Sequence, residues 1–280
     1  MLSTIESRIE NILHLLQSVA NEICEYQENK NYEVYQKEDG TIVTDVDFYS
    51  HVAISQGLKE IFGEIEILSE ENDFDENVRI SKLQYFFLLD PLDGTKSFHK
   101  GDGFSVNLCF CVEGKPVISF IFISTEDCII FNDSVNVYKK CGNKIEAIKV
   151  NKHYNPQPTL KMITGSNVNN EMILKAKQEI VKFGYNDLEL IHDPALTKLS
   201  HFIYDDLVDG IVLAGKTKDW DILPIIPILD KLKIYFSSGE LNSKDKFVVN
   251  YNNDFSFPVF FAIKDQNLFY DVHEIWSKIS

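Results

Sequence analysis

The chain has 280 residues, of which 44% are hydrophobic, and its 27 basic and 43 acidic side chains give a formal net charge of −16. This length and composition predict a globular protein built as one large domain or two smaller ones. The strong negative charge argues against a nucleic-acid polymer or an anionic membrane surface as a partner. A small anionic substrate would therefore need metal ions to offset the repulsion.

The sequence has no run of 18 consecutive apolar residues, and Glu6, Arg8 and Glu10 stand where a signal peptide would be apolar. We therefore expect a cytoplasmic protein. The odd number of cysteines, without zinc-type spacing, predicts reduced and mostly buried thiols at Cys24, Cys109, Cys111, Cys128 and Cys141. Cys109 and Cys111 would place both sulfur atoms on one strand face, where core packing is favoured over a metal site.

Two helices are expected before the strand predicted at residue 65. Ser3 and Glu6 form a capping-box pattern. Apolar residues at steps of three and four then predict one long amphipathic helix through Ile5, Ile9, Ile12, Leu16, Val19 and Ile23. Thr44 and Asp47 resemble the cap of a second helix, and spacing alone favours Asp47 as a helix-terminal carboxylate.

A half-buried strand at residues 65–67 is predicted to end at Leu68-Ser69-Glu70-Glu71. Glu70 would thus lie at a strand end. The many acidic residues from here to position 76 are typical of a solvated loop, which is the interpretation for Glu71.

Residues 85–89 are apolar and predict a buried strand, which leads into Asp90-Pro91-Leu92-Asp93-Gly94-Thr95. Asp90 and Asp93 offer the anionic oxygens that Mg²⁺ accepts, and Pro91 would aim the Leu92 carbonyl between them. Gly94 permits a close turn, and a helix opening at Thr95 could hold a phosphate. Either Asp-Pro or Asp-Gly alone would be an ordinary turn.

The remainder of the first half predicts helices on an antiparallel sheet, with a hairpin formed by residues 104–112 and 117–123 and strands at 129–131 and 135–138. The polar, proline-containing segment 151–158 is the expected boundary between an N-terminal half, 1–150, and a C-terminal half, 151–280. The second half alternates strands and helices, which is typical of a layered α/β fold. Asp221 is expected at a helix N-terminus, and Asp271 is expected to cap a short final helix.

The string from Asp90 to Thr95 resembles the signature of the inositol monophosphatase superfamily of magnesium-dependent phosphatases. Three further motifs stand in that family's order and approximate spacing, namely Val43-Thr44-Asp45-Val46-Asp47, Leu68-Ser69-Glu70-Glu71 and Trp220-Asp221. The resemblance implies an α/β fold with an α+β N-terminal half, arranged as a layered αβαβα sandwich. It also favours a functional role for Asp47, because the matching aspartate hydrogen-bonds the motif's threonine.

The resemblance implies two or three Mg²⁺ ions, held by Glu70, Asp90, Leu92, Asp93 and Asp221. One ion would activate a water held by Glu70 and Thr95, with Asp47 tuning the Thr95 hydroxyl, and another would steady the leaving oxygen. The residues expected to contact substrate are Asp93, Gly94, Thr95, Lys96, Ser166 and Asp221. An ordinary turn is favoured over substrate contact at Ser166, and the segment from Asp193 to Lys198 departs from the family's Gly-Ser loop.

Lys96 after the Asp-Gly-Thr string resembles the CysQ-type 3'(2'),5'-bisphosphate nucleotidases of this superfamily. The expected reaction is hydrolysis of the 3'-phosphate of adenosine 3',5'-bisphosphate, with Lys96 pairing with the second phosphate. A solvated surface lysine is an equally good interpretation of Lys96. The alternatives are an inositol monophosphatase, a fructose 1,6-bisphosphatase and a degenerate homologue that binds metal and phosphate for regulation. The resemblance also implies inhibition by lithium and allows a homodimer.

Overall fold

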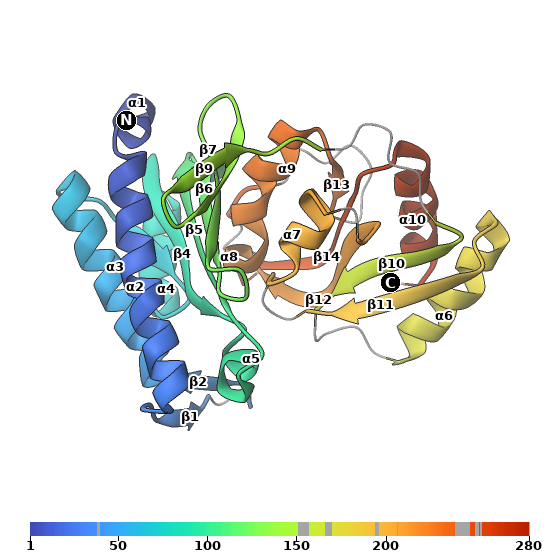
Figure 1. Ribbon diagram of the computed structural model, residues 1–280, viewed down its shortest axis with the longest axis horizontal. Helices are drawn as coiled ribbons and strands as arrows, with labels where there is room; N and C mark the ends of the chain where they lie inside the picture. The colour runs from blue at the N-terminus through green and yellow to red at the C-terminus, as the bar shows by residue number, and fades with distance from the viewer. Residues whose placement is uncertain are drawn as a thin grey trace.

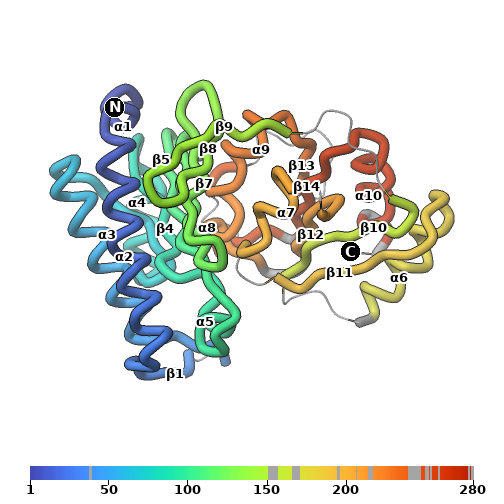
Figure 2. Tube along the Cα trace, in the orientation of Figure 1, coloured from blue at the N-terminus to red at the C-terminus, as the bar shows by residue number. Residues whose placement is uncertain are grey.

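The computed structural model covers residues 1–280 and describes all of them except 38–39, 151–156, 166–169, 194–195, 206, 239–246, 250–251, 253 and 280. Figure 1 shows the described elements as alternating layers of helix and sheet, with one helical layer between two sheets and further helices outside each sheet. The predicted αβαβα sandwich is confirmed. Figure 2 shows that the chain builds these layers in order, apart from the central helices, which come from the second half.

In the described residues the first sheet has seven strands in the order β3-β4-β5-β6-β7-β8-β9, and only β3 and β4 are parallel. Its strands are β3 (Ile67–Ser69), β4 (Tyr85–Asp93), β5 (Ser105–Val112), β6 (Lys115–Ile123), β7 (Cys128–Asn132), β8 (Val137–Cys141) and β9 (Lys144–Ala147). The predicted hairpin is therefore formed by β5 and β6.

The N-terminal helices cover one face of this sheet (Figure 1). They are α1 (Leu2–Glu6), α2 (Ile9–Asn29) and α3 (Asp45–Phe62), and a small hairpin of β1 (Val34–Gln36) and β2 (Ile42–Thr44) joins α2 to α3. Helix α4 (Phe74–Ser81) follows β3 and places Ile80 in the core on the opposite face of the sheet. The prediction of one long first helix is wrong, because the helix is interrupted at Ser7 and Arg8. The Ser3 cap is also wrong, since α1 already begins at Leu2 and has no side-chain cap.

Strand β4 is buried on both faces because a helical layer lies on each side of the sheet. Successive strand residues point to opposite faces. Phe87 and Leu89 accordingly join the core beneath the N-terminal helices. Phe86 and Leu88 join the core shared with the central helices. A continuous apolar run is therefore what this strand requires.

The second sheet has, among the described residues, the order β11-β10-β12-β14-β13. Its strands are β10 (Thr159–Thr164), β11 (Asp187–His192), β12 (Gly210–Lys218), β13 (Tyr235–Ser237) and β14 (Ser256–Ile263). The central helical layer contains α7 (Leu199–Ile203), α8 (Asp219–Ile222), η2 (Leu223–Ile225) and α9 (Ile226–Leu232). The outer layer contains α6 (Asn170–Ile180), η1 (Val181–Phe183) and α10 (Gln266–Ile279).

The final helix differs from the prediction. It begins at Gln266, so Asp271 lies inside α10 and accepts a hydrogen bond from the Tyr185 hydroxyl at 3.3 Å. Asp265 takes the capping role, because its carboxylate accepts the Leu268 backbone N–H at 2.8 Å. The expected boundary between the two halves falls largely on residues 151–156, which lie outside the described residues.

The sequence predicted that all five cysteines are reduced, and this prediction is wrong for two of them. Cys128 and Cys141 form a disulfide, because the antiparallel pairing of β7 with β8 sets them opposite each other with their Cα atoms 4.4 Å apart. The sulfur atoms of Cys109 and Cys111 lie 3.8 Å apart in the core, on one face of β5 as predicted. In the described part of the chain, no helix is long and apolar enough to cross a membrane.

Candidate metal and phosphate site

The turn at the end of β4 is shaped by an interruption in its pairing with β5. Asp90 pairs with Asn107 and Asp93 pairs with Ser105, and the register shifts between these pairs. The Asp90 carboxylate accepts the Leu92 backbone N–H at 3.1 Å, and the Ser50 hydroxyl of α3 donates to the Pro91 carbonyl at 2.7 Å. The irregularity therefore brings both aspartates to one end of the strand.

Gly94 connects this turn to helix α5 (Thr95–Lys100). Its φ of 84° lies in the left-handed region, where a side chain would be strained. The Gly94 carbonyl accepts the N–H groups of Ser97 and Phe98 at 2.8 and 2.9 Å, which starts the helix. Gln27 of α2 donates to the Phe98 carbonyl at 2.7 Å and ties α5 to the N-terminal helices.

Three carboxylates meet beside this turn. Oxygen atoms of Asp90, Asp93 and Asp221 all lie within 4.8 Å of one another. Asp221 comes from α8, 128 positions after Asp93, and its carboxylate accepts the Lys218 backbone N–H at 2.9 Å. The cluster thus joins the first sheet to the central helical layer.

The electrostatics of this cluster favour a bound cation. Burial, followed by the charge of Glu70, raises the pKa of Asp221 to about 7. Burial and the neighbouring carboxylates also raise the pKa values of Asp90 and Asp93 well above their ordinary range. The charge of Asp221 is among the causes that raise the pKa of Asp90, so the two carboxylates repel each other. A cation bound between them would offset that repulsion.

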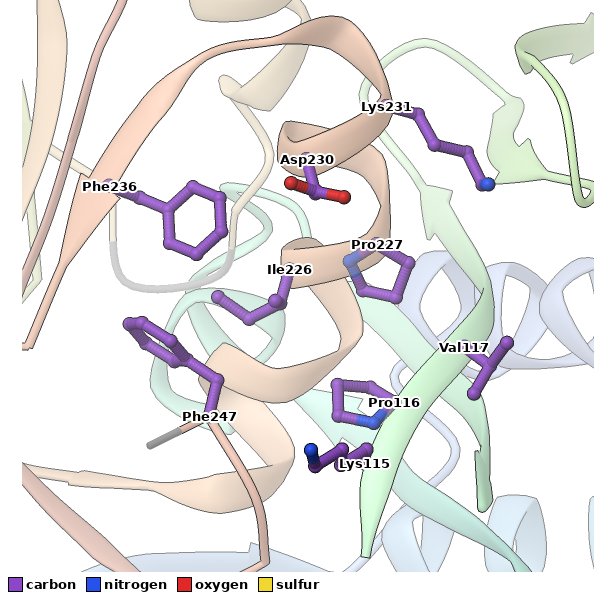
Figure 3. A pocket seen from close by; sticks show the side chains of 9 residues that line it. All are labelled: Lys115, Pro116, Val117, Ile226, Pro227, Asp230, Lys231, Phe236 and Phe247. Carbon is purple, nitrogen blue, oxygen red and sulfur yellow. The ribbon is translucent and has the colours of Figure 1, made fainter. Parts of the chain in front are cut away.

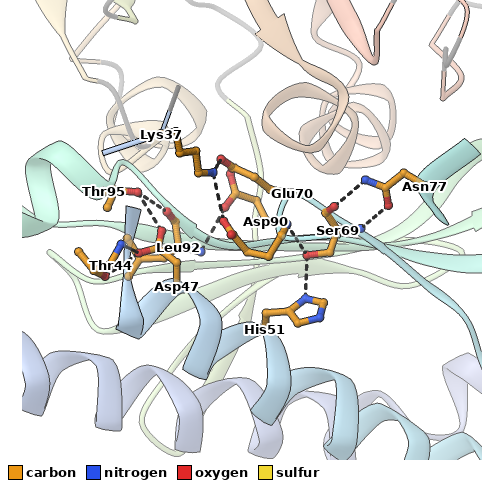
Figure 4. A network of polar contacts seen from close by, with 11 residues as sticks. Lys37, Thr44, Asp47, His51, Ser69, Glu70, Asn77, Asp90, Leu92 and Thr95 are labelled. Carbon is orange, nitrogen blue, oxygen red and sulfur yellow. Dashed lines mark hydrogen bonds and ion pairs between the residues drawn. The ribbon is translucent and has the colours of Figure 1, made fainter. Parts of the chain in front are cut away.

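Asp47 connects helix α3 to Thr95 (Figure 4). One Asp47 oxygen accepts the Thr44 backbone N–H at 2.8 Å and the Thr44 hydroxyl at 2.6 Å, which caps α3. The other oxygen accepts the Thr95 hydroxyl at 2.9 Å. The Asp47 side chain therefore both caps helix α3 and accepts a hydrogen bond from Thr95. Burial raises the Asp47 pKa, although these donated hydrogen bonds oppose the shift.

Glu70 is placed by the pairing of β3 with β4. Its backbone N–H donates to the Leu89 carbonyl at 3.2 Å, so Glu70 stands beside the start of the aspartate turn. The Asn77 side chain accepts from the Ser69 N–H at 3.1 Å and donates to the Ser69 carbonyl at 2.7 Å, which fixes the end of β3. Lys37 contacts Glu70 with its ammonium nitrogen 3.0 Å from a carboxylate oxygen (Figure 4).

Glu71 is not the solvated loop residue that the sequence suggested. Its side chain is only 4% exposed and lies 3.5 Å from the Lys37 ammonium. Burial raises the Glu71 pKa to about 7 against the opposing effect of Lys37. The sequence gives no signal for this contact, because Lys37 and Glu71 lie 34 positions apart in the chain.

The structure gives fewer observations on the residues that were expected to contact the substrate than on the expected metal ligands. Lys96 is exposed at the start of α5 and makes no ion pair with any described residue. Ser166 lies outside the described residues. The sequence reasoning missed Lys198, whose ammonium lies 4.0 Å from the carboxylate of the buried Asp193. Asp193 in turn contributes to the raised pKa of Asp93, so Lys198 belongs to the surroundings of the cluster.

Asp193 is held in place by its own loop. It accepts the Thr197 hydroxyl and the Lys198 backbone N–H, both at 2.6 Å. This Asp-to-Lys turn is the segment that departs from the family's Gly-Ser loop. In the sequence, the only indication of a role for this turn was that it begins with an acidic residue, Asp193. The approach of Asp193 to Asp93 could not be predicted, because it depends on how the two sheets pack.

Comparison with known proteins identifies the family of this chain. The model of the inositol monophosphatase family matches residues 6–231. The 3'(2'),5'-bisphosphate nucleotidase CysQ of Salmonella typhimurium is 30% identical over 167 residues, which are 59% of this chain and 66% of that protein. The chain thus matches slightly less than two-thirds of that relative's length.

Two solved structures show the same fold. CysQ from Bacteroides thetaiotaomicron is 20% identical, with a TM-score of 0.70 over 93% of this chain and 98% of that chain. An IMPase/NADP phosphatase complexed with Mg²⁺ and phosphate is 18% identical, with a TM-score of 0.70 over 98% and 95% of the two chains. Because the family model extends over most of the sequence, the chain belongs to the inositol monophosphatase family.

Proposed function

We propose that this protein is a Mg²⁺-dependent phosphomonoesterase that hydrolyses the 3'-phosphate of adenosine 3',5'-bisphosphate. The observation that carries the proposal is the cluster of Asp90, Asp93 and Asp221, whose carboxylate oxygens lie within 4.8 Å of one another. Family membership and the similarity to CysQ proteins support the same reaction class.

The side chains of this cluster fit magnesium. Hard carboxylate oxygens are the ligands that Mg²⁺ accepts, and burial together with the neighbouring carboxylates raises the pKa values of Asp90 and Asp221, an effect that a bound cation would oppose. We propose that Glu70, Asp90, Asp93, Asp221 and the Leu92 carbonyl hold two or three ions. Bound Mg²⁺ would supply the positive charge that lowers the pKa of the attacking water and stabilises the leaving oxygen.

The surrounding residues orient that water. Because Thr95 donates its hydroxyl proton to Asp47 at 2.9 Å, the lone pairs of the Thr95 oxygen remain available to accept a hydrogen bond. Glu70 would accept a proton from the same water. The water oxygen then bonds to phosphorus, the ester P–O bond breaks on the opposite side, and the leaving oxygen takes a proton from solvent. The products are inorganic phosphate and an alcohol.

A second phosphate on the substrate requires cations beyond the metal site. Lys96 is exposed one residue after Thr95, and Lys198 lies beside Asp193 on the opposite half of the molecule. Both can pair with an anion, since lysine is a point charge on a flexible stem. A bisphosphorylated nucleotide would use such charges, whereas an inositol monophosphate would not.

The test compares kcat/KM with Mg²⁺ for adenosine 3',5'-bisphosphate, inositol 1-phosphate and fructose 1,6-bisphosphate, because specificity is a ratio of these values. We expect the nucleotide to be preferred by about tenfold or more. A tenfold preference for inositol 1-phosphate would contradict the substrate assignment and leave the metal site standing. Absence of phosphate release from all three would favour the regulatory homologue.

Variants of the two lysines test whether they bind the second phosphate of the bisphosphorylated nucleotide. We expect Lys96→Ala and Lys198→Ala each to lower kcat/KM for the bisphosphate by about tenfold, roughly the value of one charge-assisted contact, and to spare a generic aryl phosphate. Lys100→Ala is the matched control, because Lys100 is exposed at the far end of the same short helix as Lys96. Equal losses on both substrates would remove the lysines from the second-phosphate site.

A further inference from the structure

A cavity lies between strand β6 and helix α9 (Figure 3). Its volume is about 290 Å³, and both halves of the chain line it. The lining residues are Lys115, Pro116, Val117, Ile226, Pro227, Asp230, Lys231, Phe236 and Phe247.

The cavity stands at the opposite end of the first sheet from the aspartates. Asp93 pairs with Ser105, and Ser105 pairs with Ile123 at the end of β6, whereas Lys115 is at the start of β6. At a rise of about 3.3 Å per residue, the length of β6 separates the two sites by about 25 Å. A molecule in this cavity would therefore not compete with a phosphate at the aspartates.

The inner wall is apolar and aromatic. The rings of Phe236 and Phe247 meet edge to face, with centroids 5.2 Å apart, and both residues are buried. Ile226 and Pro227 at the start of α9 line the cavity beside them (Figure 3). Such a wall favours a flat apolar or aromatic group.

The polar part of the cavity is positive, in contrast to the net charge of the chain. Lys115 is exposed and makes no ion pair with any described residue. Lys231 donates to the Ser134 carbonyl at 2.7 Å, and a lysine has two further N–H donors. Asp230 also lines the cavity, so the two lysines and this one carboxylate give the lining a formal charge of about +1.

We propose that this cavity is a binding site for a small aromatic anion, whose ring lies against Phe236 and Phe247 and whose charge pairs with Lys115. The volume is close to the lower end of known small-molecule sites, so the ligand has one or two fused rings. The site is independent of the phosphatase chemistry proposed above.

The test uses 2-naphthoate as the probe and its neutral isostere 2-naphthamide as the chemical control. The full chain is labelled with ¹³C at isoleucine δ1 methyl groups, and the Ile226 signal is assigned as the one lost in Ile226→Val. We expect 2-naphthoate to shift the Ile226 signal in a saturable titration and 2-naphthamide to bind several-fold more weakly. An unshifted Ile226 signal, or equal binding of the amide, would overturn the proposal.

Two further measurements test whether Lys115 pairs with the ligand and whether the cavity is separate from the acidic cluster. Lys115→Gln should weaken the binding of 2-naphthoate by about threefold, the value of an exposed ion pair, whereas Lys59→Gln on the exposed surface of α3 should not. Saturating inorganic phosphate with Mg²⁺ should leave the naphthoate affinity unchanged. Displacement by phosphate, or an equal effect of the two lysine variants, would refute the assignment.

Discussion

Asp93 is oriented by two donors from the neighbouring strand. The Ser105 hydroxyl and the Asn107 amide both donate to the same Asp93 oxygen, at 3.0 and 3.2 Å. With one oxygen held by these donors, the carboxylate still has its second oxygen to offer to a cation. This arrangement makes Asp93 the most informative single residue to change.

Asp93→Asn should lower turnover by roughly 100-fold or more, because an amide lacks the negative charge and one of the two oxygens of the carboxylate. Without metal its thermal midpoint should equal or exceed that of the unchanged protein, since one repelling carboxylate has been removed. Initial rates at saturating Mg²⁺ and a thermal melt measure the two effects. Asp75→Asn, on the exposed surface of α4, is the control and should change neither. Unchanged turnover in Asp93→Asn would exclude Asp93 from the site.

Thr95 and Asp47 should act as one unit in catalysis. Thr95→Ala is expected to lower kcat more than it raises KM, because the hydroxyl orients a water rather than holding the substrate. The 2.9 Å hydrogen bond between the two side chains predicts that Asp47→Asn added to Thr95→Ala costs far less than the sum of the single losses. A double-mutant cycle on kcat/KM measures this coupling. Additive losses would reduce Asp47 to a helix cap.

At the scale of elements, helix α5 aligns the aspartate turn with Thr95. Both ends of this short helix have a glycine in the left-handed region, Gly94 with φ of 84° and Gly101 with φ of 83°. The two glycines share a backbone conformation but differ in position, since only Gly94 lies between Asp93 and Thr95. Substitutions at the two glycines can therefore distinguish the effect of backbone strain on stability from the effect of the position of Thr95 on catalysis.

Gly94→Ala and Gly101→Ala should each lower the free energy of unfolding by about 1–2 kcal/mol, the cost of a left-handed alanine. Only Gly94→Ala should also reduce kcat, because relief of the strain at this position moves Thr95 relative to Asp93. Urea unfolding and initial rates at one temperature compare the variants. Similar kcat values for both would show that α5 tolerates the displacement of its first turn.

At the scale of the whole molecule, the acidic cluster lies where the first sheet meets the central helices, so its charge affects the packing of the two halves. One apolar core contains residues from both halves, such as Leu88 of β4 and Ile222 of α8. Repulsion among the carboxylates at its edge opposes this packing whenever they are ionised without metal. Stability should therefore depend on pH and on Mg²⁺ together.

The metal-free protein should lose stability as the pH rises from about 4 to about 7. The pKa of Asp221 is raised to about 7 in the folded state from 3.8, so folding favours its protonated form. That contribution is complete below the lower pKa and is lost as the pH passes the higher one. Thermal melts in a chelator should give a lower midpoint at pH 7.5 than at pH 5, and Mg²⁺ should raise the midpoint more at pH 7.5.

Asp221→Asn is the control for this effect and should flatten the pH dependence of the metal-free protein. A metal-free midpoint that rises between pH 5 and pH 7.5 would contradict the assignment of raised pKa values to the cluster. The Mg²⁺ effect would then have to arise elsewhere.

The sequence by itself determined the features that depend on neighbouring residues. The apolar run of β4, the turn that follows it, and the cap formed by Thr44 and Asp47 are local patterns, and their residue types restrict the backbone directly. The order of the motifs was enough to indicate the family and its layered fold. It also selected the acidic residues that the structure brings together, whose catalytic roles stay a prediction.

Only the tertiary structure decided which distant residues meet. The burial of Glu71 under Lys37, the approach of Asp193 and Lys198 to Asp93, and the disulfide of Cys128 with Cys141 all depend on strand register and on the packing of the sheets. The break between α1 and α2 was likewise invisible in a periodic pattern that continues through it. These contacts arise from long-range packing, which the local spacing of residues does not specify.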